Sequence, residues 1–125
     1  MKLTIQSNKI RIRLRKSEVA RFGSEHCIED TLRYGASAED CLHYGLKCSS
    51  SSQILSLQCS SNRITILVPQ ALADSWTSGD GVEIEGKSMD GPTEVTILVE
   101  KEFRRLHGAL PDPDLYPNPL EGTVH

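Results

Sequence analysis

The chain has 125 residues, of which 38% are hydrophobic and 25% are charged, and its net charge is −3. This composition is typical of one soluble globular domain, and the small number of aromatic residues predicts a core of Ile, Leu and Val. No apolar run reaches the roughly 18 residues of a membrane-spanning helix and no signal peptide is evident, so we expect a cytoplasmic protein.

Charge is distributed unevenly along the chain. Residues 1–21 carry seven basic side chains and one acidic side chain, a net charge of +6, whereas residues 22–125 carry seven basic and sixteen acidic side chains, a net charge of −9. This asymmetry predicts one surface for an anionic partner and a remainder that repels such a partner.

The first half of the chain alternates apolar and polar residues in a way that predicts four strands and one helix. The expected elements are strands over Lys2–Gln6 and Lys9–Arg15, a helix over Ser17–Phe22, and strands over Cys27–Tyr34 and Cys41–Cys48. Ser7–Asn8 has the chemistry of a tight hairpin turn. Ser17 is a candidate helix cap, and Gly23 is a natural end for the helix.

Four consecutive serines, residues 49–52, separate the two halves and have the composition of a flexible link. The second half repeats the order of the first, with strands over Gln53–Cys59 and Arg63–Val68, a helix over Pro69–Trp76, and strands over Val82–Glu85 and Thr93–Glu102. Pro69 suits the first turn of a helix, where its missing N–H group costs nothing.

A shift of 54 residues superposes the two halves without a gap. Asn8–Phe22 then falls on Asn62–Trp76, and further along the chain Ile28 falls on Val82. Apolar positions coincide in both the strands and the helix, which indicates an internal repeat. We therefore expect two half-domains, residues 1–48 and 53–106, that form one intertwined globular domain.

The four cysteines form no C-x-x-C pair, and their spacing is unlike that of common zinc sites. Cys48 and Cys59 have the strand parity of small core residues. A metal site drawn from His26, Cys27, Cys41 and His43 is the alternative to a structural role. We expect no metal and no cofactor. The sequence also shows no recognisable arrangement of a nucleophile and a base, so we expect no catalytic residues and a protein that is not an enzyme.

The last segment, residues 107–125, contains four of the six prolines and is predicted to be an extended tail. Its apolar residues permit two interpretations. They either cover an edge of the protein, or they belong to an acidic arm that binds a partner protein. For the second interpretation the candidate partner-binding residues are Leu115, Tyr116 and Leu120.

A succession of motifs in the second half carries a resemblance. It consists of Asn62-Arg63 after a turn, the alternating stretch Ile64-x-Ile66-x-Val68, the helical segment Pro69–Ala73 and the segment Gly79–Glu85. Over about 40 residues this succession resembles the AbrB/MazE type of swapped-hairpin barrel, found in bacterial transition-state regulators and antitoxins. The first half departs from that pattern, with Arg15 in place of a proline and Glu25-His26 in place of Gly-Asp. The chain is also similar to small uncharacterised bacterial proteins with a Tyr-Pro-Asn-Pro tail.

The resemblance implies a mainly β fold in which two ββαββ repeats, with two short helices, interleave their hairpins into one barrel. Because both repeats lie in one chain, we expect a monomer that acts as a pseudo-dimer. In the AbrB/MazE type, basic groups on the matching turn and strand grip DNA. The corresponding candidates here are Asn8, Lys9, Arg11, Arg13, Arg15 and Arg63.

Two functional hypotheses follow. The first is a non-enzymatic DNA-binding or regulatory module, in which outward-facing Arg11, Arg13 and Arg15 follow the phosphates of duplex DNA. The alternative for these arginines is a solvated strand face paired with acids across the sheet. The second hypothesis is an antitoxin-like protein-interaction module, in which the acidic tail occupies a groove on a partner.

Overall fold

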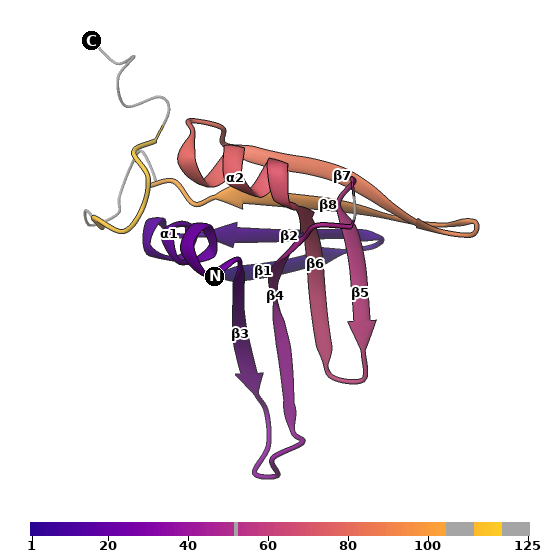
Figure 1. The fold of residues 1–125 in the computed structure, drawn as a ribbon. Coiled ribbons are helices and arrows are strands. Elements are labelled where there is room, and N and C mark those ends of the chain that lie inside the picture. The colour runs from indigo at the N-terminus through magenta and orange to yellow at the C-terminus, as the bar shows by residue number, and fades with distance from the viewer. Residues whose placement is uncertain (52, 105–111, 119–125) are drawn as a thin grey trace.

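The computed structural model describes residues 1–51, 53–104 and 112–118 (Figure 1). The elements in chain order are β1 (Lys2–Gln6), β2 (Lys9–Leu14), α1 (Lys16–Glu25), β3 (Cys27–Arg33), β4 (Cys41–Ser49), β5 (Ser56–Ser60), β6 (Arg63–Pro69), α2 (Gln70–Ser78), β7 (Glu83–Asp90) and β8 (Thr93–Lys101). All ten elements occur in the predicted order, so the fold is mainly β with two helices. No helix in the described part of the chain is both long and apolar enough to cross a membrane.

The strands form two mixed four-stranded sheets, and each sheet takes one hairpin from each half of the chain. Sheet A has the order β1-β2-β8-β7, and sheet B has the order β3-β4-β6-β5. The two central pairs, β2 with β8 and β4 with β6, are parallel and join the halves. In Figure 1 both sheets extend away from the helices, each in a different direction. The described strands do not close into one barrel, unlike the expected architecture.

Strand registers define an internal pseudo-twofold. In sheet A, Val99 lies between Ile12 on one neighbouring strand and Ile84 on the other. In sheet B, Leu46 lies in the same way between Ile66 and Ile28. Ile28 therefore corresponds to Ile84, and the predicted match of Ile28 with Val82 is wrong. The reason is local: the segment that links α2 to β7 is longer than the segment that links α1 to β3.

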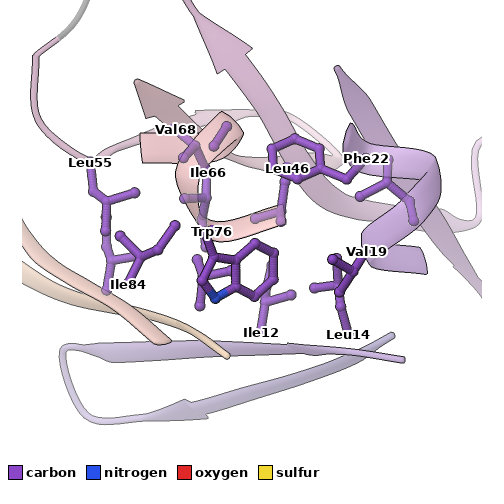
Figure 2. Close-up of a cluster of buried hydrophobic side chains, with 14 of the residues drawn as sticks. Ile12, Leu14, Val19, Phe22, Leu46, Leu55, Ile66, Val68, Trp76 and Ile84 are labelled. Carbon is purple, nitrogen blue, oxygen red and sulfur yellow. The ribbon is translucent and has the colours of Figure 1, made fainter. Parts of the chain in front are cut away.

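The buried side chains of both halves form one core between the sheets and the helices (Figure 2). Phe22 of α1 and Trp76 of α2, which the repeat predicts to be counterparts, are both buried. The largest fully buried side chains are Phe22, Ile12, Leu14, Leu46, Ile66, Ile97, Val68 and Val99. Each contributes about 1.5–3 kcal/mol through burial. Since these residues come from both halves, neither half has a core of its own.

Helix α1 differs from the prediction at both ends. It continues past Gly23 to Glu25, and His26 ends it in the left-handed conformation with φ of 64°. Gly23 is used for packing instead, since a Cβ there would lie only 3.2 Å from the side chain of Thr77 in α2. At the other end Ser17 does not act as the helix cap, because Arg15 occupies the cap position.

Strand boundaries differ less. Strand β5 begins at Ser56, so residues 53–55, which were predicted to be part of it, precede the strand. Leu55 is nevertheless buried. Strand β7 is longer than predicted and reaches Asp90. Pro69 is the last residue of β6, directly before α2.

Candidate functional site

The predicted DNA-binding arginines lie on the outer face of sheet A. Arg11 and Arg13 are on β2, and Arg15 follows its end, so alternation turns all three away from the core residues of the same strand. Their side chains are 33%, 39% and 41% exposed, respectively. The predicted direction of the arginine row is therefore correct.

One acidic side chain of the second half lies beside the first two arginines. Glu100 is beside Arg13 in the β2–β8 register, and its Oε1 is 2.9 Å from Arg13 Nε and 3.0 Å from Arg11 Nε. One carboxylate thus serves two guanidinium groups, and the parallel pairing of the two halves places it there.

The third arginine is covered by the tail. Arg15 Nη1 lies 2.9 Å from an oxygen of Asp112 and 3.9 Å from one of Asp114, and Arg15 Nε lies 3.9 Å from Glu102. Glu102 also pairs with Lys2. Four basic and four acidic side chains therefore meet along this face, and the opposite charges of the two halves neutralise each other inside the molecule.

The remaining DNA-binding candidates have different surroundings. The side-chain amide of Asn8 donates to the Glu94 carbonyl oxygen at 3.1 Å and anchors the β1–β2 turn to β8. Arg63 Nε donates to Glu29 at 2.7 Å on the outer face of sheet B. Lys9 is exposed at the start of β2. The six candidates are thus divided between two sheets.

The tail packs against the body of the protein. The Tyr116 ring is partly buried on the core, its centroid is 5.9 Å from that of Phe103, and burial raises the pKa of Tyr116. The Tyr116 N–H donates to the Glu102 carbonyl oxygen at 3.0 Å. Leu115 is partly exposed, with its N–H on the Asp112 carbonyl oxygen, and Leu120 lies outside the described residues.

Asp114 of the tail supplies the cap that α1 lacks. Its carboxylate accepts the Ser17 N–H at 2.9 Å and the Ser17 hydroxyl at 2.8 Å. These hydrogen bonds from Ser17 lower the pKa of Asp114, and the charges of Arg15 and Lys16 act in the same direction. A carboxylate at a helix N-terminus is also stabilised by the helix dipole.

A buried lysine fastens the tail, and the sequence interpretation overlooked it. Lys101 is 6% exposed, with Nζ 5.5 Å from the centre of the Trp76 ring and 5.4 Å from that of Tyr116. Its Nζ donates to the Gly79 carbonyl oxygen at 2.9 Å. Burial lowers the pKa of Lys101, against an opposing effect of Asp80. The sequence could have indicated this burial, because Lys101 lies on the same side of the strand as the core residues Ile97 and Val99.

The cysteines are all free thiols, and the described residues contain no cluster of three or more potential metal ligands among His, Cys, Asp and Glu. Cys48 packs against the core, as predicted, and burial raises its pKa. Cys59 is exposed, so its predicted core position is wrong. Cys41 is buried, with Sγ 3.5 Å from His43 Nε2.

An open groove of about 390 Å³, which the sequence did not reveal, lies between β1 and the β3–β4 hairpin. Its lining residues are Met1, Lys2, Leu3, Thr4, Leu32, Leu42 and Tyr44. Nearby apolar side chains are unusually exposed, at 60% for Ile5, 54% for Leu32 and 66% for Tyr34. Both flanking strands are sheet edges in the described part of the fold.

The pseudo-twofold provides a reference for this groove, because β5 and β7 are the counterparts of β1 and β3. There, the side chain of Leu55 is 2% exposed and packs so closely on Gly86 that a Cβ on that glycine would lie 3.1 Å away. The Leu57 N–H donates to Ser88 Oγ at 3.1 Å, which joins the two edges.

The first half has different residues at the matching positions. Registers place Asp30 where Gly86 stands and Leu32 where Ser88 stands. A carboxylate leaves no room for the Leu55-like packing, and leucine offers no acceptor for an edge N–H. Asp30 instead interacts with Tyr44, whose pKa is raised by burial and by that carboxylate. The β5–β7 edge is therefore closed, whereas the β1–β3 edge remains open.

Residues 1–120 match a family described as a family of unknown function, DUF7009. No curated protein and no solved structure matches the chain.

Proposed function

The chain belongs to the DUF7009 family, whose function is unknown. From the geometry of the chain itself, we propose that it is a non-enzymatic protein-interaction module. It binds an extended segment of a partner protein in the groove between β1 and β3. The observation that carries this proposal is the open groove itself, at the place where the equivalent β5–β7 edge is closed by Leu55 and Ser88.

The chemistry of the closed edge indicates what the open edge accepts. On the closed side an aliphatic side chain fills the space and an oxygen accepts the edge N–H of Leu57. An extended segment provides both features, since alternate aliphatic side chains enter the groove while its backbone carbonyls accept hydrogen bonds from a strand edge. The walls Leu3, Leu32 and Leu42 favour Leu, Ile or Val in the bound segment.

The test uses a phage-displayed library of random extended peptides as the probe. We expect the protein to enrich sequences with alternating aliphatic residues, and we expect a synthetic copy to shift the amide resonances of residues 2–6 and 27–33. Leu32→Glu abolishes this binding, whereas Met89→Glu, at a side chain of similar exposure (57%) on β7, leaves it intact.

Failure to enrich peptides, or peptides that shift other strands, would remove the proposal. A dimer whose formation requires Leu32 would instead identify a second copy of the chain as the occupant. Light scattering distinguishes this outcome, because the proposal expects a monomer.

DNA binding through the arginine row stays a second prediction. In its favour, Arg11, Arg13 and Arg15 share one face and each remains at least one-third exposed. It predicts a salt-dependent shift of duplex DNA that Arg11→Ala with Arg13→Ala abolishes and that Glu100→Gln strengthens, because this change frees two guanidinium groups. Absence of a shift at low salt in both the wild-type protein and the Glu100→Gln variant would exclude it.

A further inference from the structure

Cys41 and His43 form a pair at the start of β4, on the outer face of sheet B and away from the groove. The two residues are two positions apart on one strand, so their side chains share a face. Cys41 Sγ lies 3.5 Å from His43 Nε2 and 3.7 Å from the side-chain amide nitrogen of Asn62. Only 3% of Cys41 is exposed, whereas the His43 side chain is 22% exposed.

Neighbouring groups fix the orientation of the imidazole. Thr31 Oγ1 lies 2.8 Å from His43 Nδ1, and the Glu29 carboxylate lies 3.8 Å from the same nitrogen. The Glu29 carboxylate only accepts, so it favours a proton on Nδ1, and the Thr31 hydroxyl can accept from that same nitrogen. This tautomer leaves the lone pair of Nε2 directed at the Cys41 thiol. A thiol, a base within reach of it, and a third group that orients the base together form the arrangement of an activated sulfur nucleophile.

We propose that Cys41 is a peroxide-reactive thiol activated by His43. The Cys41 proton passes to His43 Nε2 and the sulfur attacks one oxygen of hydrogen peroxide. The O–O bond breaks, and the departing hydroxide takes the proton from His43 and leaves as water. The sulfur is oxidised by two electrons to a sulfenic acid, and the peroxide is reduced.

Burial selects the reactant. The Cys41 thiol is enclosed by Asn62 and by the Ala38 carbonyl oxygen, which lies 3.6 Å away. Hydrogen peroxide is small enough to reach such a site, whereas larger electrophiles react first with exposed thiols. The chain supplies its own comparators, because Cys27 and Cys59 are exposed, and burial raises the pKa of Cys48.

The experiment treats the reduced, full-length protein with hydrogen peroxide for a fixed time, removes the peroxide, and unfolds the protein in denaturant that contains dimedone, so that the trap reaches buried and exposed sulfenic acids alike. Labelling at each cysteine is then measured by mass spectrometry. We expect Cys41 to be labelled at least about tenfold faster than Cys59. With iodoacetamide the order reverses, and Cys27 and Cys59 are labelled first. Peroxide labelling of Cys41 no faster than that of Cys59 would overturn the proposal.

Two variants test the role of the base. His43→Gln reduces the peroxide labelling of Cys41 at least about tenfold and leaves that of Cys59 unchanged. Thr31→Val keeps the imidazole but removes the hydroxyl beside Nδ1, so it lowers the Cys41 rate by a smaller factor and serves as the test if His43→Gln does not fold by circular dichroism. An unchanged Cys41 rate in a folded variant would also overturn the proposal.

Discussion

At the scale of single residues, the arginines on the outer face of sheet A have acidic partners from the second half and the tail. Glu100 lies between Arg11 and Arg13, and Asp112 and Asp114 lie near Arg15. The arginines were predicted from alternation alone, since residues on one side of a strand repeat every second position. Their acidic partners were not predictable in this way, because they are at least 87 positions away in the chain.

Asp114→Ala tests the most local of these contacts. Removing the carboxylate leaves the Ser17 N–H and hydroxyl without their acceptor, so we expect the Tm to fall by a few degrees at neutral pH. Because the pKa of Asp114 is lowered in the folded state, its contribution is present above the ordinary carboxyl pKa of about 3.9 and is lost as pH falls below it.

Thermal melts of both proteins between pH 7 and pH 2.5 provide the measurement. We expect the difference in Tm to become smaller as the pH falls, because the contribution is lost as the pH passes through the lowered pKa of the folded state. Asp90→Ala, at an exposed carboxylate in β7, is the control and leaves the Tm unchanged. A difference that persists undiminished at pH 2.5 would contradict a charge-dependent cap.

At the scale of elements, the described part of the tail, residues 112–118, acts as a strap. Tyr116 packs on Phe103 and Lys101, and the tail backbone hydrogen-bonds to Glu102 and Arg104. Its apolar residues therefore support the interpretation that the tail covers the protein. The sequence left both interpretations open, because a proline-rich segment is extended whether it lies on its own chain or on a partner.

Tyr116→Ala and Tyr34→Ala form a matched pair that measures this strap. Tyr116 loses contacts with the core, so we expect the free energy of unfolding to fall by about 2 kcal/mol. Tyr34 is 66% exposed, and its replacement changes the free energy of unfolding by less than about 0.5 kcal/mol. Urea melts distinguish the two variants, and deletion of residues 108–125 lowers the Tm further. Equal stability of both variants would instead favour a tail free to bind a partner.

At the scale of the whole molecule, each half completes the sheets of the other. The parallel pairs β2–β8 and β4–β6 both cross between halves, and the core draws on residues of both. Isolated halves thus expose their apolar faces and lack half of each sheet. The serine link keeps the halves at an effective concentration of roughly millimolar, which makes their association intramolecular.

Separate production of residues 1–51 and 53–125 tests this dependence. We expect each piece alone to be unfolded by circular dichroism, and an equimolar mixture to regain the β-rich spectrum of the intact chain. Chemical shifts of the mixture that match those of the intact protein would complete the test. A half that folds as a monomer by itself would contradict the exchanged arrangement.

Local patterns along the chain were enough to predict the ten elements, their order, the internal repeat and the outward direction of the arginines. These features follow from short-range periodicity and from turn residues such as Gly and Pro, which act through neighbours in the chain. The predicted end of α1 at Gly23 is wrong, because the small size of this glycine serves the contact with Thr77 instead.

Three features became visible only in the folded molecule: two separate sheets in place of a barrel, the acid that each arginine meets, and the contrast between a closed sheet edge and its open counterpart. The match between Ser88 and Leu32 appears only in the observed strand registers. The gapless alignment of the two repeats predicts a different match in this segment. Such pairings join residues far apart in the chain, and a shift in strand register changes every partner at once. Periodicity fixes which way a side chain points, but packing between distant segments fixes what it meets.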